Sequence, residues 1–201
     1  NVVIDAVVSI IWIVGITNSI NFFDNLDGGA AGAVAAASVF TFLIAYYEGQ
    51  ILVSALAIVI AGAMFGFLIW NKSPARIYMG DAGALFLGIL IASLTIRLHP
   101  RTNLTLSSLL TPFFLLAVPI LDTSVAVISR VSSGLSPFQG GKDHLSHRLM
   151  RKGLTKPITA LILWAGTGLF SFTAVLLQFL TQRQQNIVGT ISFLLIFFSY
   201  L

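Results

Sequence analysis

Residues 51–70 read ILVSALAIVIAGAMFGFLIW, an uninterrupted stretch of twenty residues without a single charged side chain. A helix of about 20 apolar residues is long enough to cross the hydrocarbon core of a bilayer. The same pattern recurs along the chain, of which 57% is apolar and only 9% is charged. No water-soluble domain of this length needs so large an apolar share. The sequence therefore predicts an all-α, polytopic integral membrane protein.

About seven transmembrane helices are expected, over residues 2–17, 29–47, 51–70, 82–98, 107–128, 158–180 and 187–201. Neither end of the chain has the pattern of a natural terminus, and no signal peptide pattern is present. We therefore expect residues 1–201 to form a single transmembrane domain that is the C-terminal portion of a larger one. The absence of cysteine excludes disulfides and thiolate metal sites.

Basic residues indicate how the chain is oriented. Seven crossings bring residues 18–28, 71–81 and 129–157 to one face, where they carry eight Lys and Arg side chains, whereas the loops of the opposite face carry three. Cytoplasmic loops of membrane proteins are enriched in Lys and Arg. The first face is therefore predicted to be cytoplasmic.

Three polar loops share this predicted cytoplasmic face. Residues 18–28 read NSINFFDNLDG, residues 71–83 read NKSPARIYMGDAG, and residues 142–148 read KDHLSHR. A chain this apolar has few polar residues. We therefore expect its chemistry to lie where Asp, Asn, His and Arg gather.

Carboxylates beside glycines and basic residues suggest a divalent metal ion together with phosphate. Mg²⁺ takes oxygen ligands and is commonly held by one or two carboxylates plus substrate phosphates. Helices that begin just after the Asp-containing loops would aim free N–H groups at an anion. Lys72, Arg76, Lys142 and Arg148 can neutralise phosphate charge. The loops thus predict an enzyme site for a phosphorylated substrate.

Each of these residues also has an ordinary structural interpretation. Asp24, Asp27 or Asp81 could be the N-cap of the next helix, because Asp is favoured there. Asn18 and Asn21 could only satisfy loop backbone. The loops by themselves leave these alternatives open.

The aromatic and histidine residues have alternatives as well. Tyr78 could belong to the aromatic belt at the membrane interface. His144 and His147 could share a helix face and bind a metal ion, although such pairs are more often solvated or face phosphate. Asp122 could reach the interface or pair with Arg130, because an unpaired charge inside a membrane is costly.

The three loops resemble three signatures of one family. Residues 18–28 resemble the Asn-x-x-Asn-x-x-Asp-Gly-x-Asp-Gly signature of the polyprenyl-phosphate N-acetylhexosamine-1-phosphate transferases, which are of glycosyltransferase family 4 type. Residues 71–83 resemble their second signature, and residues 143–149 resemble their His-rich loop. The resemblance covers essentially the whole chain in order, spacing and membrane topology.

The resemblance implies a multi-pass enzyme of the bacterial plasma membrane with a cytoplasmic active site. It would transfer a sugar 1-phosphate from a UDP-sugar to a polyprenyl phosphate such as undecaprenyl phosphate. The products would be a polyprenyl-diphospho-sugar and UMP, at the start of a cell-wall or surface polysaccharide. Mg²⁺ would be the cofactor, with Mn²⁺ as the alternative ion. Expected partners are the two substrates and the lipid bilayer, with no nucleic acid, and a homodimer is left open.

The resemblance also implies roles for individual residues. Asp81 would be the metal ligand, and Asp24 and Asp27 would line the nucleotide-sugar site. Tyr78 would stack on the uracil. The other implied site residues are Asn18, Asn21 and Asn71, which would fix substrate polar groups, and His144, His147 and Arg148, which would contact the diphosphate or the sugar.

The third loop favours UDP-N-acetylglucosamine as the donor, because members that use UDP-N-acetylmuramoyl-pentapeptide typically have three consecutive histidines. The pentapeptide transferase is the alternative. Asn25 replaces a usual Gly, and Ala84 stands where Ser is common. The adjacent Asp-Asp pair of the family is not in these 201 residues.

Two other classes of protein compete with this interpretation. An intramembrane aspartyl protease would carry Gly-x-Gly-Asp, but Tyr78 occupies the first Gly position and the candidate aspartates lie in polar loops. A transporter for an anionic substrate would need charged or broken sites in the middle of its spans. Apart from Asp122, the spans offer few such residues.

Overall fold

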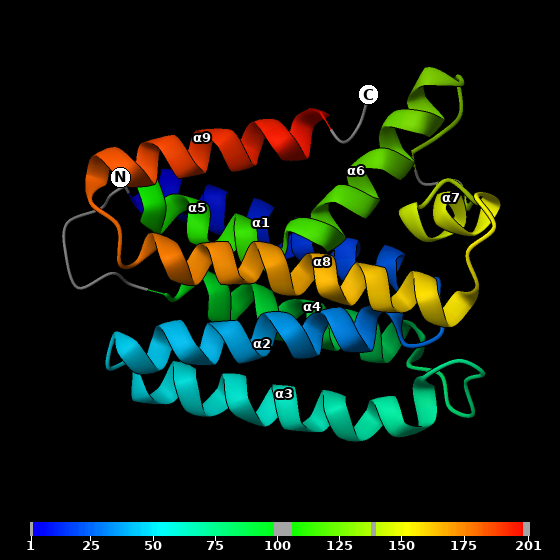
Figure 1. Ribbon diagram of the computed structural model, residues 1–201, viewed down its shortest axis with the longest axis horizontal. Coiled ribbons are helices and arrows are strands. Elements are labelled where there is room, and N and C mark those ends of the chain that lie inside the picture. The colour runs from blue at the N-terminus through cyan, green and yellow to red at the C-terminus, as the bar shows by residue number, and fades with distance from the viewer. Residues whose placement is uncertain (1, 99–105, 138–139, 199–201) are drawn as a thin grey trace.

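The computed structural model describes residues 2–98, 106–137 and 140–198. Every regular element in these ranges is a helix, so the all-α prediction is confirmed. The helices, drawn in Figure 1, are α1 (Val2–Phe23), α2 (Gly29–Tyr47), α3 (Ile51–Asn71), α4 (Gly80–Ile96), α5 (Leu106–Leu115), α6 (Ala117–Ser132), α7 (Leu145–Arg151), α8 (Lys156–Leu177) and α9 (Gln182–Phe198).

Four helices of the described ranges, α1, α2, α3 and α8, are long and apolar enough to cross a membrane. The apolar helix α4 is somewhat shorter, with 17 residues. Large apolar side chains on these helices face outward, among them Val8 at 57% exposure and Val59 at 66%. A water-soluble bundle would bury such residues, so the chain is a multi-pass membrane protein.

The span predicted over residues 107–128 is wrong as a single helix. It is divided at Leu116, whose φ of −115° and ψ of 19° separate α5 from α6. Pro119 explains the division, because proline has no N–H with which to bond the carbonyl four residues earlier and its ring clashes with that carbonyl. The carbonyl in question belongs to Leu115, and the Ser171 hydroxyl of α8 donates to it at 3.4 Å. A neighbouring helix thus satisfies the polar group that the break exposes.

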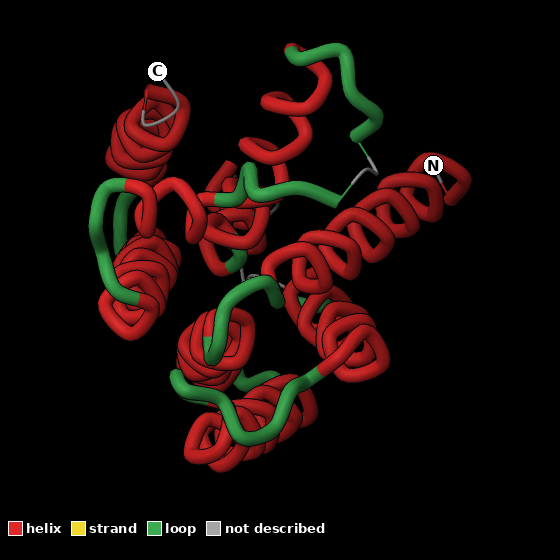
Figure 2. Tube along the Cα trace, turned by 90° about the vertical axis from the view of Figure 1, so that its right-hand side faces the viewer, coloured by secondary structure: helices red, strands yellow, loops and turns green. Residues whose placement is uncertain are grey.

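The remaining helices lie side by side. Figure 1 shows α2 between α3 and α8, and α1 packs mainly against α4. Figure 2 shows the same bundle after a 90° turn. The segments that join α1 to α2, α3 to α4 and α6 to α8 all lie at one end of the bundle (Figure 1). The prediction that the three polar loops share one face is therefore confirmed.

An apolar cavity of about 710 Å³ runs between α3 and α4. Its wall is made of aliphatic and aromatic side chains such as Leu56, Phe67 and Leu90, with Tyr78 towards the polar loops and Arg97 towards the other end. The wall carries no carboxylate or histidine among the described residues. The lining of this cavity is therefore almost wholly apolar.

The crossing of α1 and α4 depends on Gly88. A Cβ atom at this position would lie 2.6 Å from the backbone Cα of Thr17 and 3.1 Å from its carbonyl oxygen. Only a residue without a side chain allows the two backbones to approach so closely. This crossing matters to the polar end of the bundle because Asn21 and Asp81 lie on these same two helices.

A Gly88→Ala variant is expected to be less stable, because the added methyl group meets backbone that cannot swing aside. Overpacking of this kind costs roughly 1–3 kcal/mol. Thermal unfolding of the full-length protein in detergent measures the effect. The matched control is Gly62→Ala, where an added Cβ meets nothing within 4 Å. Equal unfolding temperatures for the two variants would contradict the close crossing.

Candidate active site at the polar end of the bundle

The first polar loop is shorter than predicted, because α1 continues to Phe23. No helix breaker occurs in this stretch before Gly28, so Asn18 and Asn21 lie on the last turns of α1. The Asn18 side chain donates to the carbonyl of Val14 in its own helix at 2.7 Å and is exposed.

The helix-cap alternative for the three aspartates is wrong. The N-cap of α2 is Gly28, which has the left-handed φ of 74° that glycine adopts readily. The N-cap of α4 is Met79, and Asp81 follows in the first helical turn, where a negative charge is favoured. Neither helix has a side-chain cap hydrogen bond. None of the three aspartates is therefore the N-cap residue of α2 or α4.

Asn71 joins the first loop to the second. Its Oδ1 accepts from the Gly28 N–H at 3.1 Å, and its Nδ2 donates to the Ile77 carbonyl at 2.9 Å. The residue is only 2% exposed. Both ends of the Asn71 amide bond to backbone, so the side chain acts as a bracket that joins the first loop to the second. This geometry does not favour direct contact of Asn71 with substrate.

Asp27 makes a second tie between the same loops. Its Oδ2 accepts from the Ala75 N–H at 3.4 Å and lies 3.7 Å from the Lys156 Nζ at the start of α8. The Lys156 side chain is 58% exposed, so this ion pair contributes little stability by itself. It nevertheless brings a cation from a third element to the edge of the site.

Asp24 and Asp81 form the acidic centre of this end. The Asn21 Nδ2 donates to the Asp81 Oδ1 at 3.2 Å. Burial, followed by the negative charge of Asp81, raises the pKa of Asp24 to about 6. A partly buried carboxylate whose pKa is raised beside an exposed one is typical of a cation site or a catalytic site.

The partner of Asp122 is His144, and the predicted pairing with Arg130 is wrong. Asp122 is fully buried in α6, where its Oδ2 lies 2.7 Å from the His144 Nδ1. Its Oδ1 accepts from the Leu145 N–H at 2.7 Å. Because Leu145 is the first residue of α7, the carboxylate caps that helix from another element. Arg130 bonds instead to the Asp143 Oδ2, at 3.2 Å.

The contacts of His144 fix its tautomer. The Arg130 Nη2 lies 3.3 Å from the His144 Nε2, and a guanidinium can only donate. Nε2 therefore accepts, and Nδ1 carries the proton that is donated to Asp122. His144 is 5% exposed, and both ring nitrogens are engaged. It therefore acts as an anchor for α7, and the structure does not leave it a nitrogen for substrate.

The other two residues of the third loop are more accessible. Arg148 is exposed, and its Nε donates to the Asp143 carbonyl at 3.1 Å, which leaves further guanidinium donors for a ligand. His147 is half-buried, and this burial is the main reason why its pKa is lowered; Lys142 and Arg151 also lower it, and Asp122 opposes them.

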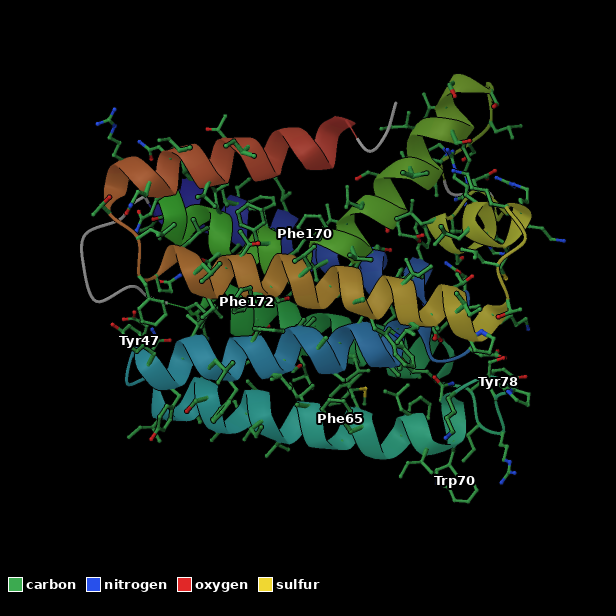
Figure 3. The ribbon with its side chains drawn as sticks, viewed as in Figure 1. Tyr47, Phe65, Trp70, Tyr78, Phe170 and Phe172 are labelled. Atoms are coloured by element: carbon green, nitrogen blue, oxygen red, sulfur yellow. The ribbon has the colours of Figure 1, made fainter. Side chains whose placement is uncertain are left out.

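Tyr78 is 72% exposed. Figure 3 shows it near Trp70 at the polar end of the bundle, with Tyr47 at the opposite end. Aromatic residues at both ends suit the interfacial belts of a membrane protein. An exposed ring at the edge of the polar loops can also stack on a planar base, so both interpretations of Tyr78 stand.

The three loops thus bring Asp24, Asp27, Asp81, His147 and Arg148 to one end of the bundle, as the sequence predicted. Among the described residues, no group of three or more His, Cys, Asp or Glu could hold a metal ion. Asp24 and Asp81 are close enough for the charge of Asp81 to raise the pKa of Asp24, after the larger effect of burial.

The roles of Asp122 and Arg130 as anchors of α7 were not predicted. A buried Asp inside an apolar span was the available signal.

Residues 1–99 match the family described as glycosyl transferase family 4. A probable undecaprenyl-phosphate N-acetylglucosaminyl 1-phosphate transferase of Bacillus subtilis (strain 168) is 38% identical over 170 residues, which is 85% of this chain and 47% of the relative. A decaprenyl-phosphate N-acetylglucosaminephosphotransferase of Mycolicibacterium smegmatis is 32% identical over 209 residues, or 93% of this chain and 52% of the relative.

A phospho-N-acetylmuramoyl-pentapeptide-transferase of Listeria monocytogenes serotype 4b (strain F2365) is 45% identical, but over only 96 residues, or 47% of this chain. The chain spans about half the length of the N-acetylglucosamine relatives that it matches. These similarities extend through the polar loops that meet at one end of the bundle, and together they show that the chain belongs to glycosyl transferase family 4.

Proposed function

We propose that the protein containing this chain transfers N-acetylglucosamine 1-phosphate from UDP-N-acetylglucosamine to a polyprenyl phosphate. An oxygen of the acceptor phosphate would attack the sugar-bearing phosphorus, and the bond from that phosphorus to the bridging oxygen would break. UMP would leave with the bridging oxygen. The observation that carries the proposal is the meeting of Asp24, Asp81, His147 and Arg148 from three separate loops at one end of a membrane bundle.

The choice of sugar rests on how far the relatives align. The N-acetylglucosamine relatives match 85–93% of this chain, whereas the pentapeptide transferases match 47–49%. The pentapeptide relatives thus leave about half of the chain without a counterpart in the match. We therefore favour N-acetylglucosamine over the pentapeptide-bearing donor.

Asp24 and Asp81 suit a divalent cation. Mg²⁺ prefers carboxylate oxygens and is often held by one or two of them, with substrate phosphates and water completing its shell. Burial and, to a smaller extent, the charge of Asp81 raise the pKa of Asp24, and such an ion would relieve the repulsion between the two carboxylates. We propose Mg²⁺ as the cofactor, with Mn²⁺ as an alternative; when bound, it would neutralise phosphate charge during the transfer.

The other residues would bind and orient the substrates. Phosphoryl transfer demands positioning and charge neutralisation more than covalent chemistry by the protein. Arg148 would donate to the diphosphate, and Tyr78 would stack on the uracil. Asp27 and Asn71 would hold the loops in place. The polar end would face the cytoplasm of a bacterial cell from its plasma membrane, and homodimer formation stays a prediction.

The test is UMP release by the full-length protein in detergent, with undecaprenyl phosphate and Mg²⁺. UDP-N-acetylglucosamine and UDP-N-acetylmuramoyl-pentapeptide are offered separately. Release with the first donor alone is expected. Release with the second alone would overturn the sugar assignment, and release with neither would contradict the proposed function.

Cation binding should weaken in acid, because a protonated carboxyl group is a poor ligand. Since the pKa of Asp24 is raised to about 6, this group is mostly ionised at pH 7 and mostly protonated at pH 5. The apparent affinity for Mn²⁺ should fall roughly tenfold over that range. Electron paramagnetic resonance of free Mn²⁺ measures it in the full-length protein.

The control for this titration is Asp24→Asn, which cannot change its charge. It should bind Mn²⁺ more weakly at pH 7 and show a flatter dependence on pH. An unchanged titration in this variant would exclude Asp24 as the group responsible.

A further inference from the structure

Asn25 links the first loop to α7. Its Nδ2 donates to the Phe22 carbonyl at 2.7 Å. A carbonyl oxygen can only accept, so this contact fixes which end of the amide points where. The Asn25 Oδ1 therefore faces the other neighbour of the side chain, which is Ser146.

Ser146 lies on α7 and is 1% exposed. Its Oγ hydroxyl donates to the Asn25 Oδ1 in a short hydrogen bond. A serine hydroxyl has one hydrogen, so nothing is left to donate elsewhere. The Ser146 Oγ can serve any further neighbour only as an acceptor.

That neighbour is His147, whose Nδ1 lies 3.3 Å from the Ser146 Oγ. Because Oγ can only accept here, Nδ1 must carry the proton. In a neutral imidazole the other nitrogen, Nε2, then keeps its lone pair. No hydrogen bond to Nε2 comes from any residue within the described ranges, and the half-buried ring leaves that nitrogen to a ligand.

The surroundings support a neutral ring. Burial lowers the pKa of His147, and the nearby cations Lys142 and Arg151 lower it further, against the opposing effect of Asp122. Asn25, Ser146 and His147 thus form a hydrogen-bond relay. Near neutral pH the His147 ring at its end carries one proton, on Nδ1, and none on Nε2.

We infer that Asn25 and Ser146 are positioning residues that hold His147 in the Nδ1–H tautomer, so that Nε2 accepts a hydrogen bond from an O–H or N–H group of the sugar nucleotide. The identity of that ligand rests on the proposed function, whereas the tautomer does not. A sugar hydroxyl or an acetamido N–H is the kind of donor that such a lone pair selects. Asn25 stands where the resembled signature has Gly, which has no side chain to begin the relay.

The relay is tested by ¹⁵N nuclear magnetic resonance of histidine-labelled, full-length protein, because the shifts of the two ring nitrogens report which one is protonated. The His147 signal is assigned by its loss in His147→Gln. The wild type should show Nδ1–H. Asn25→Gly should shift the ring towards Nε2–H, because the freed Ser146 hydroxyl can then donate to Nδ1.

Further variants separate the relay from general damage. Ser146→Ala should abolish the tautomer preference, whereas Ser146→Thr and Asn25→Asp, which keep the donor and the acceptor, should retain it. Ser132→Ala is the matched control, because the Ser132 hydroxyl donates within its own helix at an exposed position. It should leave the His147 signal unchanged.

Kinetics test the substrate contact. Loss of one hydrogen bond of this kind should raise the KM for the UDP-sugar roughly threefold to tenfold in Ser146→Ala and in Asn25→Gly, with a smaller change in kcat. Since both residues act through one nitrogen, the double variant should be no worse than either single variant.

Each outcome decides one part of the inference. A wild-type Nε2–H tautomer, or an Nδ1–H tautomer that survives both Ser146→Ala and Asn25→Gly, would overturn the relay. A tautomer that changes while KM stays constant would overturn the contact with substrate. If no donor is turned over at all, the proposed function fails, and the resonance data still decide the relay.

Discussion

An Asp81→Asn variant of the full-length protein should lose UMP release by on the order of a thousandfold, the largest effect expected at this site. Asparagine keeps the size of the side chain and removes its negative charge. That charge would hold the cation that neutralises the phosphate during the transfer. The same change should lower the pKa of Asp24 towards its ordinary value, because the charge of Asp81 is one cause of its elevation. UMP release measures the first effect and Mn²⁺ binding against pH the second.

The control for Asp81 is Glu48→Gln at the opposite end of the bundle, where α2 ends. It should release UMP within about twofold of the wild type, because Glu48 lies at the end of α2 that is remote from the polar loops. If Asp81→Ala keeps its Mg²⁺ dependence and a normal metal affinity, Asp81 is not a metal ligand.

An Asp122→Ala variant should suffer the largest loss of stability. The His144 Nδ1 and the Leu145 N–H would both lose a buried partner at 2.7 Å. Each hydrogen bond to a charged group contributes about 1.5–3 kcal/mol, and this substitution removes two of them. Since the same carboxylate holds the start of α7, UMP release should also fall, by roughly tenfold to a hundredfold. Thermal unfolding and hydrogen exchange of the α7 amides measure the two consequences.

The neighbouring residue provides the control for Asp122. The Thr123 hydroxyl is buried and has no hydrogen-bond partner in the described part of the chain. Thr123→Val should therefore leave stability unchanged or slightly raised, because an unpaired polar atom is replaced by a methyl group of the same shape. Equal losses in the two variants would show that the helix, and not the carboxylate, is what Asp122→Ala disturbs.

Helix positions were predictable because the bilayer sets the length of an apolar run. Residues 29–47 and 51–70 were expected as spans, and α2 (Gly29–Tyr47) and α3 (Ile51–Asn71) match them within one residue. The meeting of the polar loops also followed, because alternating crossings leave each loop only two faces to choose from. The larger number of Lys and Arg residues in these loops then predicted that this face is cytoplasmic.

Other features depend on contacts that no local pattern contains. Mean hydropathy averages over residues 107–128 and is little changed by Pro119, so it does not reveal the helix break at Leu116. Asp122 meets His144 from 22 residues away, and Asn25 meets Ser146 from 121 residues away. A sequence can identify such polar residues as unusual, but only the packed helices determine which of them become partners.

The bracket made by Asn71 has a consequence for any molecule that lands on the polar end. One amide bonds to backbone of both the first and the second loop, so neither can swing open without breaking the bonds of that side chain. The first and second polar loops thus take up their arrangement when the protein folds, before a ligand binds. A ligand that binds there has little loop motion to arrest, so more of its contact energy is retained as affinity.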